Sequence, residues 1–132
     1  MKLNALSAAV LLGIALMSGA PPAWVHHSGV MFDRTKVVKI HGLVKEFLWT
    51  NPHSSFKVNV AGPDGAVKTW LIEMNSPNNI VREGWKRTTL KPGDEVTVAI
   101  NPLRDGRPGG WYVGITLPDG KSLGGASPAP GE

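Results

Sequence analysis

The chain contains no cysteine among its 132 residues. Disulfide bonds, thiolate metal sites and cysteine nucleophiles are therefore excluded, and so is lipid attachment to an N-terminal cysteine. The chain also lacks a large excess of positive or negative charge. Its 14 Lys and Arg are nearly balanced by 10 Asp and Glu, which gives a formal net charge of +4. A small surplus spread along the chain favours solubility and is not typical of nucleic-acid-binding proteins. We therefore expect no nucleic-acid partner.

Long apolar runs are absent except for one near the N-terminus. Residues 3–17, LNALSAAVLLGIALM, follow Met1-Lys2 and precede SGAPPA. A basic start, an apolar stretch and small residues in that order are typical of a secretory signal peptide. The stretch is shorter than the roughly 20 residues that a membrane-spanning helix needs. The sequence predicts export to the periplasm and no stable membrane anchor after processing, with a retained anchor as the alternative.

The rest of the chain is dominated by short segments in which apolar residues alternate with polar ones. This period of two is typical of half-buried β-strands bounded by turns. Strands are predicted over residues 37–49, 54–60, 67–74, 95–100 and 111–117. In the last of these strands, alternation places Trp111, Val113, Ile115 and Leu117 on one buried face.

One short helix is predicted between the third and fourth strands. Ser76 stands at its N-cap, Pro77 at its first position and Gly84 where a C-cap belongs. Gly42 in the long first strand predicts a bulge or a sharp bend. This order of elements favours an all-β fold, a small five-stranded OB-like Greek-key barrel, and the alternative is a β-sandwich.

The predicted organisation has four parts. They are a signal peptide (1–23), an extended N-terminal arm (24–35), the OB-like barrel domain (36–123) and a disordered tail (124–132).

Four stretches of the sequence together resemble a family of uncharacterised bacterial exported proteins, domain of unknown function 6152. They are HHSGVMFD, GLVKEFLWTNPH, WLIEMNSPNNIVREGWKRTTLKPGDEVTV and NPLRDGRPGGWYVGITLPDGKSL. The resemblance implies an exported single-domain protein without an established activity, and it supplies no catalytic residue. Members of the family usually have Ala directly before the His pair, whereas this chain has Val25.

The adjacent His26 and His27 predict a Cu(II) site on the arm. Cleavage after Ala23 would leave His26 as the third residue, where the terminal amine, two backbone amides and an imidazole surround Cu(II) in a square plane. Cleavage after Val25 would make His26 the terminus, so that its own amine and imidazole chelate the ion. Cleavage after Ala20 is disfavoured by the proline that follows. His53 is the predicted third protein ligand, and its alternative role is to cap a turn through a backbone bond.

A second hypothesis concerns a ligand rim made of Trp70, Arg104 and Arg107. Exposed aromatic and basic side chains near the loop between the last two strands are typical of OB binding surfaces. This hypothesis describes a module that recognises an envelope peptide, glycan or protein partner. We expect Trp85 and Trp111 to pack in the core.

Catalysis is not expected. The HExxH zinc motif is absent, and Ser54 and His53 are neighbours on a strand, which point to opposite faces. Glu46 and Glu73 are the carboxylates that an acid–base mechanism would use if they faced each other. His41 lies on the face opposite Ile40, where we expect it to be solvated.

Overall fold

The computed structural model describes residues 31–124 of the chain. The predicted signal peptide, most of the arm with His26 and His27, and nearly all of the predicted tail lie outside these residues. The described strands are β1 (Val38–Leu48), β2 (Ser55–Ala61), β3 (Val67–Glu73), β4 (Glu95–Pro102), β5 (Gly109–Thr116) and β6 (Ser122–Leu123). Helix α2 (Pro77–Ile80) and the 3₁₀ helix η1 (Val81–Glu83) lie between β3 and β4. Among the described residues, no helix is both long and apolar enough to cross a membrane.

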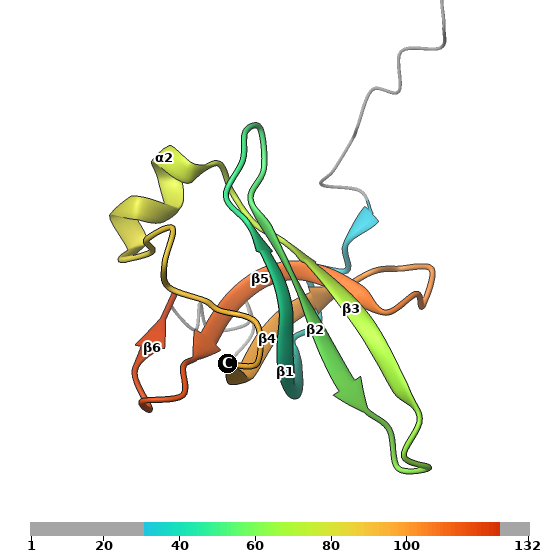
Figure 1. Cartoon of the computed structure of the whole chain (residues 1–132). Helices are drawn as coiled ribbons and strands as arrows, with labels where there is room; N and C mark the ends of the chain where they lie inside the picture. Colours follow the sequence, from blue (N-terminus) through green and yellow to red (C-terminus); the bar gives the residue numbers. More distant parts are fainter. Residues whose placement is uncertain (1–30, 125–132) are drawn as a thin grey trace, which may run out of the picture.

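The strands form one closed barrel. Their order is β3-β2-β1-β4-β5-β6, and neighbours in this order pair antiparallel. A parallel pairing of β3 with β5, from Leu71↔Gly109 to Glu73↔Trp111, closes the barrel. Figure 1 shows the bent strands around the barrel and α2 beside one end of it. The five-stranded OB-like barrel, with its helix between the third and fourth strands, is thus confirmed.

The barrel core contains side chains from all five long strands and from the helical connection. Trp85, which follows η1, is only 1% exposed. Its indole lies against the rings of Phe47, Phe56 and Tyr112, with centroids 5.7, 6.0 and 5.3 Å away. The expected packing of Trp85 across the end of the barrel is therefore confirmed.

The irregularity in β1 lies three residues beyond the glycine that predicted it. The register with β2 shifts between Val44 and Glu46, so Lys45 is the extra residue. Gly42 has a different role, because a Cβ there would lie 2.2 Å from the carbonyl oxygen of Asn59. The glycine permits close approach of two backbones, and the bulge prediction was wrong in its position.

The predicted buried face of β5 was right for Ile115 but wrong for Trp111, on the other side of a bulge. Ala99 pairs with Gly114 and Ile100 pairs with Tyr112, so Val113 is an extra residue in β5. This bulge reverses the alternation, and Tyr112 and Ile115 point inward with 8% and 3% exposure. Trp111 therefore lies on the outside of the barrel, where it is half-buried.

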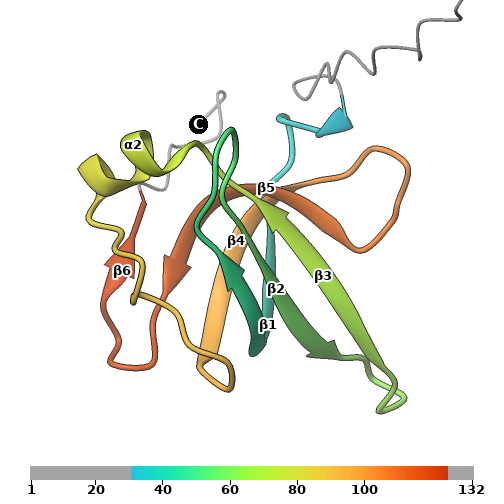
Figure 2. The ribbon, with the colours of Figure 1, turned by 45° about the horizontal axis from the view of Figure 1, so that its top comes forward.

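The described start of the chain lies on the barrel, although it belongs to the segment predicted as an extended arm. Phe32 forms a β-bridge with Leu103 and is 1% exposed. The Asp33 N–H donates to the carbonyl of Pro102 over 2.8 Å, and the Arg104 N–H donates to the carbonyl of Met31 over 2.9 Å. Figure 2 shows this segment, in cyan, beside β5. We call residues 31–36 the arm root.

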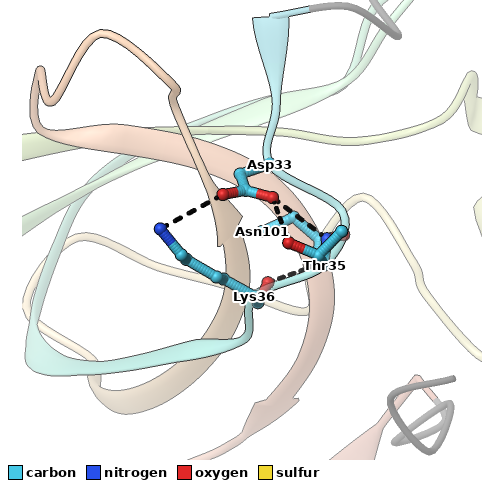
Figure 3. A network of polar contacts seen from close by, with 4 residues as sticks. All are labelled: Asp33, Thr35, Lys36 and Asn101. Atoms are coloured by element: carbon cyan, nitrogen blue, oxygen red, sulfur yellow. Dashed lines mark hydrogen bonds and ion pairs between the residues drawn. The ribbon is translucent and has the colours of Figure 1, made fainter. Parts of the chain in front are cut away.

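A polar network fixes the arm root in place (Figure 3). The Asp33 carboxylate accepts hydrogen bonds from the Thr35 N–H at 3.2 Å and its hydroxyl at 2.6 Å. The same carboxylate forms an ion pair with Lys36 at 3.3 Å. The buried Asn101 amide donates to the carbonyl of Lys36 over 2.7 Å, which ties the network to β4. The network therefore holds the arm root against the barrel.

Candidate functional site

Three side chains pack around the outward-facing indole of Trp111. Two of them come from the arm root and one comes from the β1–β2 loop. The ring centroids of Phe32 and His53 lie 5.7 and 5.6 Å from that of Trp111, and the His53 ring meets it edge-on. The Arg34 guanidinium carbon lies 5.9 Å from the same centroid, in reach of a cation–π interaction. We call these four residues the Trp111 cluster. The arm root and His53 therefore contact the same indole.

Strand pairing explains why His53 reaches this position. His53 lies in the β1–β2 loop, two residues before β2 begins at Ser55. Ser55 pairs with Glu73 of β3, and Glu73 pairs with Trp111 of β5. The end of the loop therefore lies at the same level of the barrel as Trp111.

The hydrogen bond made by His53 determines which ring nitrogen is available. Its Nδ1 lies 2.9 Å from the carbonyl oxygen of Met74. A carbonyl only accepts, so Nδ1 carries the proton and donates it, and the neutral ring has its lone pair on Nε2. Metal-ligating histidines commonly have this arrangement, with the second nitrogen held by a backbone carbonyl. His53 thus makes the backbone hydrogen bond expected of a turn cap through Nδ1, and its Nε2 can still act as a metal ligand.

The described residues do not form a metal site by themselves. Between residues 31 and 124 there is no group of three or more His, Asp or Glu side chains that could hold a metal ion. His53 would need donors from outside this range, and the predicted partners His26 and His27 lie there. His41 is exposed on β1, and its two nitrogens lie 3.0 Å from Thr97 Oγ1 and Glu95 Oε1.

One of the three predicted rim residues lies on β3, and the other two lie in the loop beside it. Trp70 points inward and is half-buried against the core. Arg104 and Arg107 are exposed in the β4–β5 loop, where the Arg107 side chain donates to Asp105 over 2.7 Å. The next residue, Pro108, accepts a hydrogen bond from the Leu71 N–H at 3.4 Å. The loop with both arginines therefore lies against the strand that contains Trp70.

The residues considered for catalysis are not brought together. Glu46 forms an ion pair with Lys57 at 2.7 Å. Lys57 alternates with buried Phe56 and Val58, so this pair lies outside the barrel. Ser54 is fully buried, whereas His53 is exposed and its Nδ1 is bonded to the Met74 carbonyl instead of the Ser54 hydroxyl. The absence of catalysis remains a prediction.

The fold and the cluster define a small OB-like barrel protein whose arm root packs on the same outward-facing indole as a histidine of the β1–β2 loop. The sequence profile of a family of unknown function, DUF6152, matches residues 14–112, and the chain belongs to this family. A comparison with curated proteins gives no match. Among solved structures, the crystal structure of Rim1, a mitochondrial single-stranded DNA-binding protein of S. cerevisiae, is similar with a TM-score of 0.48 and 15% identity. The alignment covers 62% of this chain and 92% of that one.

The OB-like barrel overturns the expectation that nucleic acid is excluded as a partner, because barrels of this type can bind oligonucleotides, and the expectation is withdrawn. The exclusion was based on the net charge of the whole chain. OB barrels bind single strands through a local basic groove and stacked aromatic rings, so a small total charge does not decide the matter.

Proposed function

We propose that the chain is an exported, non-enzymatic periplasmic module that binds Cu(II) through His26, His27 and His53. The observation that supports this proposal is the orientation of His53. Its Nδ1 donates to the carbonyl of Met74, its exposed ring has Nε2 available as a ligand, and it shares Trp111 with the arm root. Imidazole nitrogen is a preferred donor for Cu(II).

The remaining donors come from the N-terminal end of the processed chain. Cleavage after Ala23 or after Val25 would free an amine within two residues of the His pair. In the first case the amine, two amides and the His26 imidazole bind the ion. In the second case the amine and imidazole of His26 bind it together, and His27 and His53 complete the site. Both arrangements give the nitrogen-rich tetragonal geometry that Cu(II) favours.

The arm is long enough to bring the His pair to His53. Phe32 and His53 each lie within 6 Å of the Trp111 centroid. The five residue steps from His27 to Phe32 span roughly 17 Å when extended. This reach exceeds the separation of the Phe32 and His53 rings, which contact the same indole.

The test uses the exported protein purified from the cell envelope. Mass spectrometry defines its first residue, and Cu(II) titration with electron paramagnetic resonance gives the affinity and the number of nitrogen ligands. We expect a Kd below about 1 µM. Replacing both His26 and His27 by Ala should abolish tight binding. His53→Ala should weaken binding roughly tenfold or more, equivalent to about 1.4 kcal/mol. In a chain that starts at His26 it should also remove one nitrogen from the spectrum, whereas in a chain that starts at Trp24 the four nitrogens of the plane come from residues 24–26 and His53 is an axial ligand.

His41→Ala is the matched control, because it removes another exposed histidine whose nitrogens face Thr97 and Glu95. It should leave both affinity and spectrum unchanged. The proposal is wrong if wild type binds only at micromolar strength or weaker, or if His53→Ala behaves as His41→Ala does. A chain that begins at Pro21 or retains its leader would equally contradict it.

A further inference from the structure

Strand β3 has one edge that the barrel covers only in part. On one side β3 pairs with β2 along its whole length, from Val67 to Glu73. On the other side β5 covers only Leu71, Ile72 and Glu73. Within residues 31–124, no strand pairs with this side of residues 67–70. We call the stretch from Val67 to Trp70 the open edge.

Two residues of the open edge, Val67 and Thr69, have backbone groups that face away from β2. The Gly62 N–H donates to the carbonyl of Ala66, so residue 66 and every second residue after it face β2. The Leu71 N–H donates to Pro108 on the opposite side, so Val67 and Thr69 also face away from β2. Their N–H and C=O groups are therefore presented to an additional strand. Such unpaired edges are templates for pairing with another chain.

Side chains on both faces of the open edge could contact an added strand. On the outer face, Val67 and Leu71 are 62% and 41% exposed although both are apolar. On the inner face, Lys68 and Trp70 help to line a pocket at the base of the β2–β3 hairpin. An extended peptide places successive side chains on alternate faces, so its residues would reach both surfaces.

The charges favour an acidic occupant over a second copy of this chain. If two copies paired antiparallel through Val67 and Thr69, each Lys68 would lie directly opposite the other, and like charges in that position are destabilising. Arg104 and Arg107 lie in the loop whose Pro108 accepts the N–H of Leu71, the residue that follows the open edge, and Arg107 is paired with Asp105 of the same loop. An added strand with carboxylates would therefore meet basic groups at Lys68 and at the β4–β5 loop.

We propose that the open edge of β3 binds an extended acidic segment of a partner protein as an additional β-strand. This goes beyond the copper proposal and does not depend on it, because the open edge and the Trp111 cluster use different residues. Backbone hydrogen bonds to Val67 and Thr69 supply affinity, and Lys68 selects an acidic partner. The rim residues Trp70, Arg104 and Arg107 surround this site.

The probe is a capped peptide of the length of β3, seven residues, that alternates Glu and Val. Its binding to the whole protein is measured by fluorescence anisotropy, and amide hydrogen exchange locates it. Binding should slow exchange at Val67 and Thr69. Thr69→Pro should weaken binding at least about tenfold, since proline cannot donate to an added strand. No β2–β3 hydrogen bond is lost, because the Thr69 N–H faces away from β2.

Thr69→Val is the matched control, because it also removes the 2.8 Å bond from the Thr69 hydroxyl to Asn59 but retains the N–H. It should bind as wild type does. Lys68→Glu should reverse the preference in favour of a peptide that alternates Lys and Val. Equal binding by the Pro and Val variants, or equal binding of both peptides to wild type, would overturn the proposal. If the Pro variant does not fold, amide exchange in wild type decides, and protection outside the open edge overturns the proposal.

Discussion

Replacement of Phe32 by Ala tests whether the arm root is part of the folded domain. Phe32 precedes the barrel strands, yet it is as buried as the core residues, at 1% exposure. Truncation of a buried Phe to Ala costs roughly 3–5 kcal/mol. We expect a value of about 3 kcal/mol, because the arm root can detach and limit the cavity. Since 1 kcal/mol shifts the melting temperature of a domain of this size by about 4–8 °C, the midpoint should fall by at least about 12 °C.

The free energy of unfolding is measured by urea denaturation at several temperatures. Met31→Ala is the control, because this neighbour is 41% exposed and its removal should change stability by no more than about 0.5 kcal/mol. A loss below about 1 kcal/mol for Phe32→Ala would refute the reasoning and show that the arm root does not contribute to the fold. Under the copper proposal, Phe32→Ala should also lower the Cu(II) affinity to the level of His53→Ala below its midpoint, because the arm root is then no longer held against Trp111.

Two further predictions concern the backbone and pH. Gly42→Ala should lower the free energy of unfolding by about 2 kcal/mol or more, because its Cβ would lie 2.2 Å from the Asn59 carbonyl oxygen. Gly114→Ala is the control, since its Cβ would lie at an ordinary 3.5 Å from the Leu123 carbonyl oxygen. It should cause a much smaller loss in the same urea denaturation assay. The hydrogen bonds from the Thr35 side chain and N–H, with Lys36, hold the pKa of Asp33 below its usual 3.8. The ionised carboxylate thus stabilises the fold above about pH 4, and this is lost as the pH falls through the lower folded pKa. Thr35→Val should flatten the dependence of the melting temperature on pH between about 2 and 5.

The strands and the helix could be predicted because each carries a local signal. Phe56, Val58 and Val60 alternate with polar residues, and Pro77 and Gly84 mark the two ends of the helical connection. The closing pair of strands has a signal as well, in the glycines of RPGGW. A Cβ on Gly109 would lie 2.8 Å from the Leu71 carbonyl, and one on Gly110 would lie 2.5 Å from that of Asn101. Two adjacent glycines at a strand start therefore indicate close backbone approach on both sides of the strand.

The faces of the strands were less predictable than their existence. Alternation assigns a side chain to the core or the surface only while the period of two is unbroken. The extra residues Lys45 and Val113 break it, and neither has a residue type that marks a bulge. One undetected bulge reverses every assignment on one side of it. For this reason Tyr112 was missed as a core residue and Trp111 was placed in the core.

The same bulge explains how the candidate site arises. With Val113 as an extra residue, β5 presents a large indole on the outside of the barrel, where it would expose extensive apolar surface. Phe32 and Arg34 from the arm root and His53 from the β1–β2 loop pack around this indole. The burial of Trp111 by these three side chains accounts for the docking of the arm root on the barrel. The arm root and His53 therefore contact the same indole in the folded protein. Under the copper proposal, the chain that leads to the His pair starts from this fixed point, so ordering the donors around Cu(II) would cost less entropy than it would from a free arm.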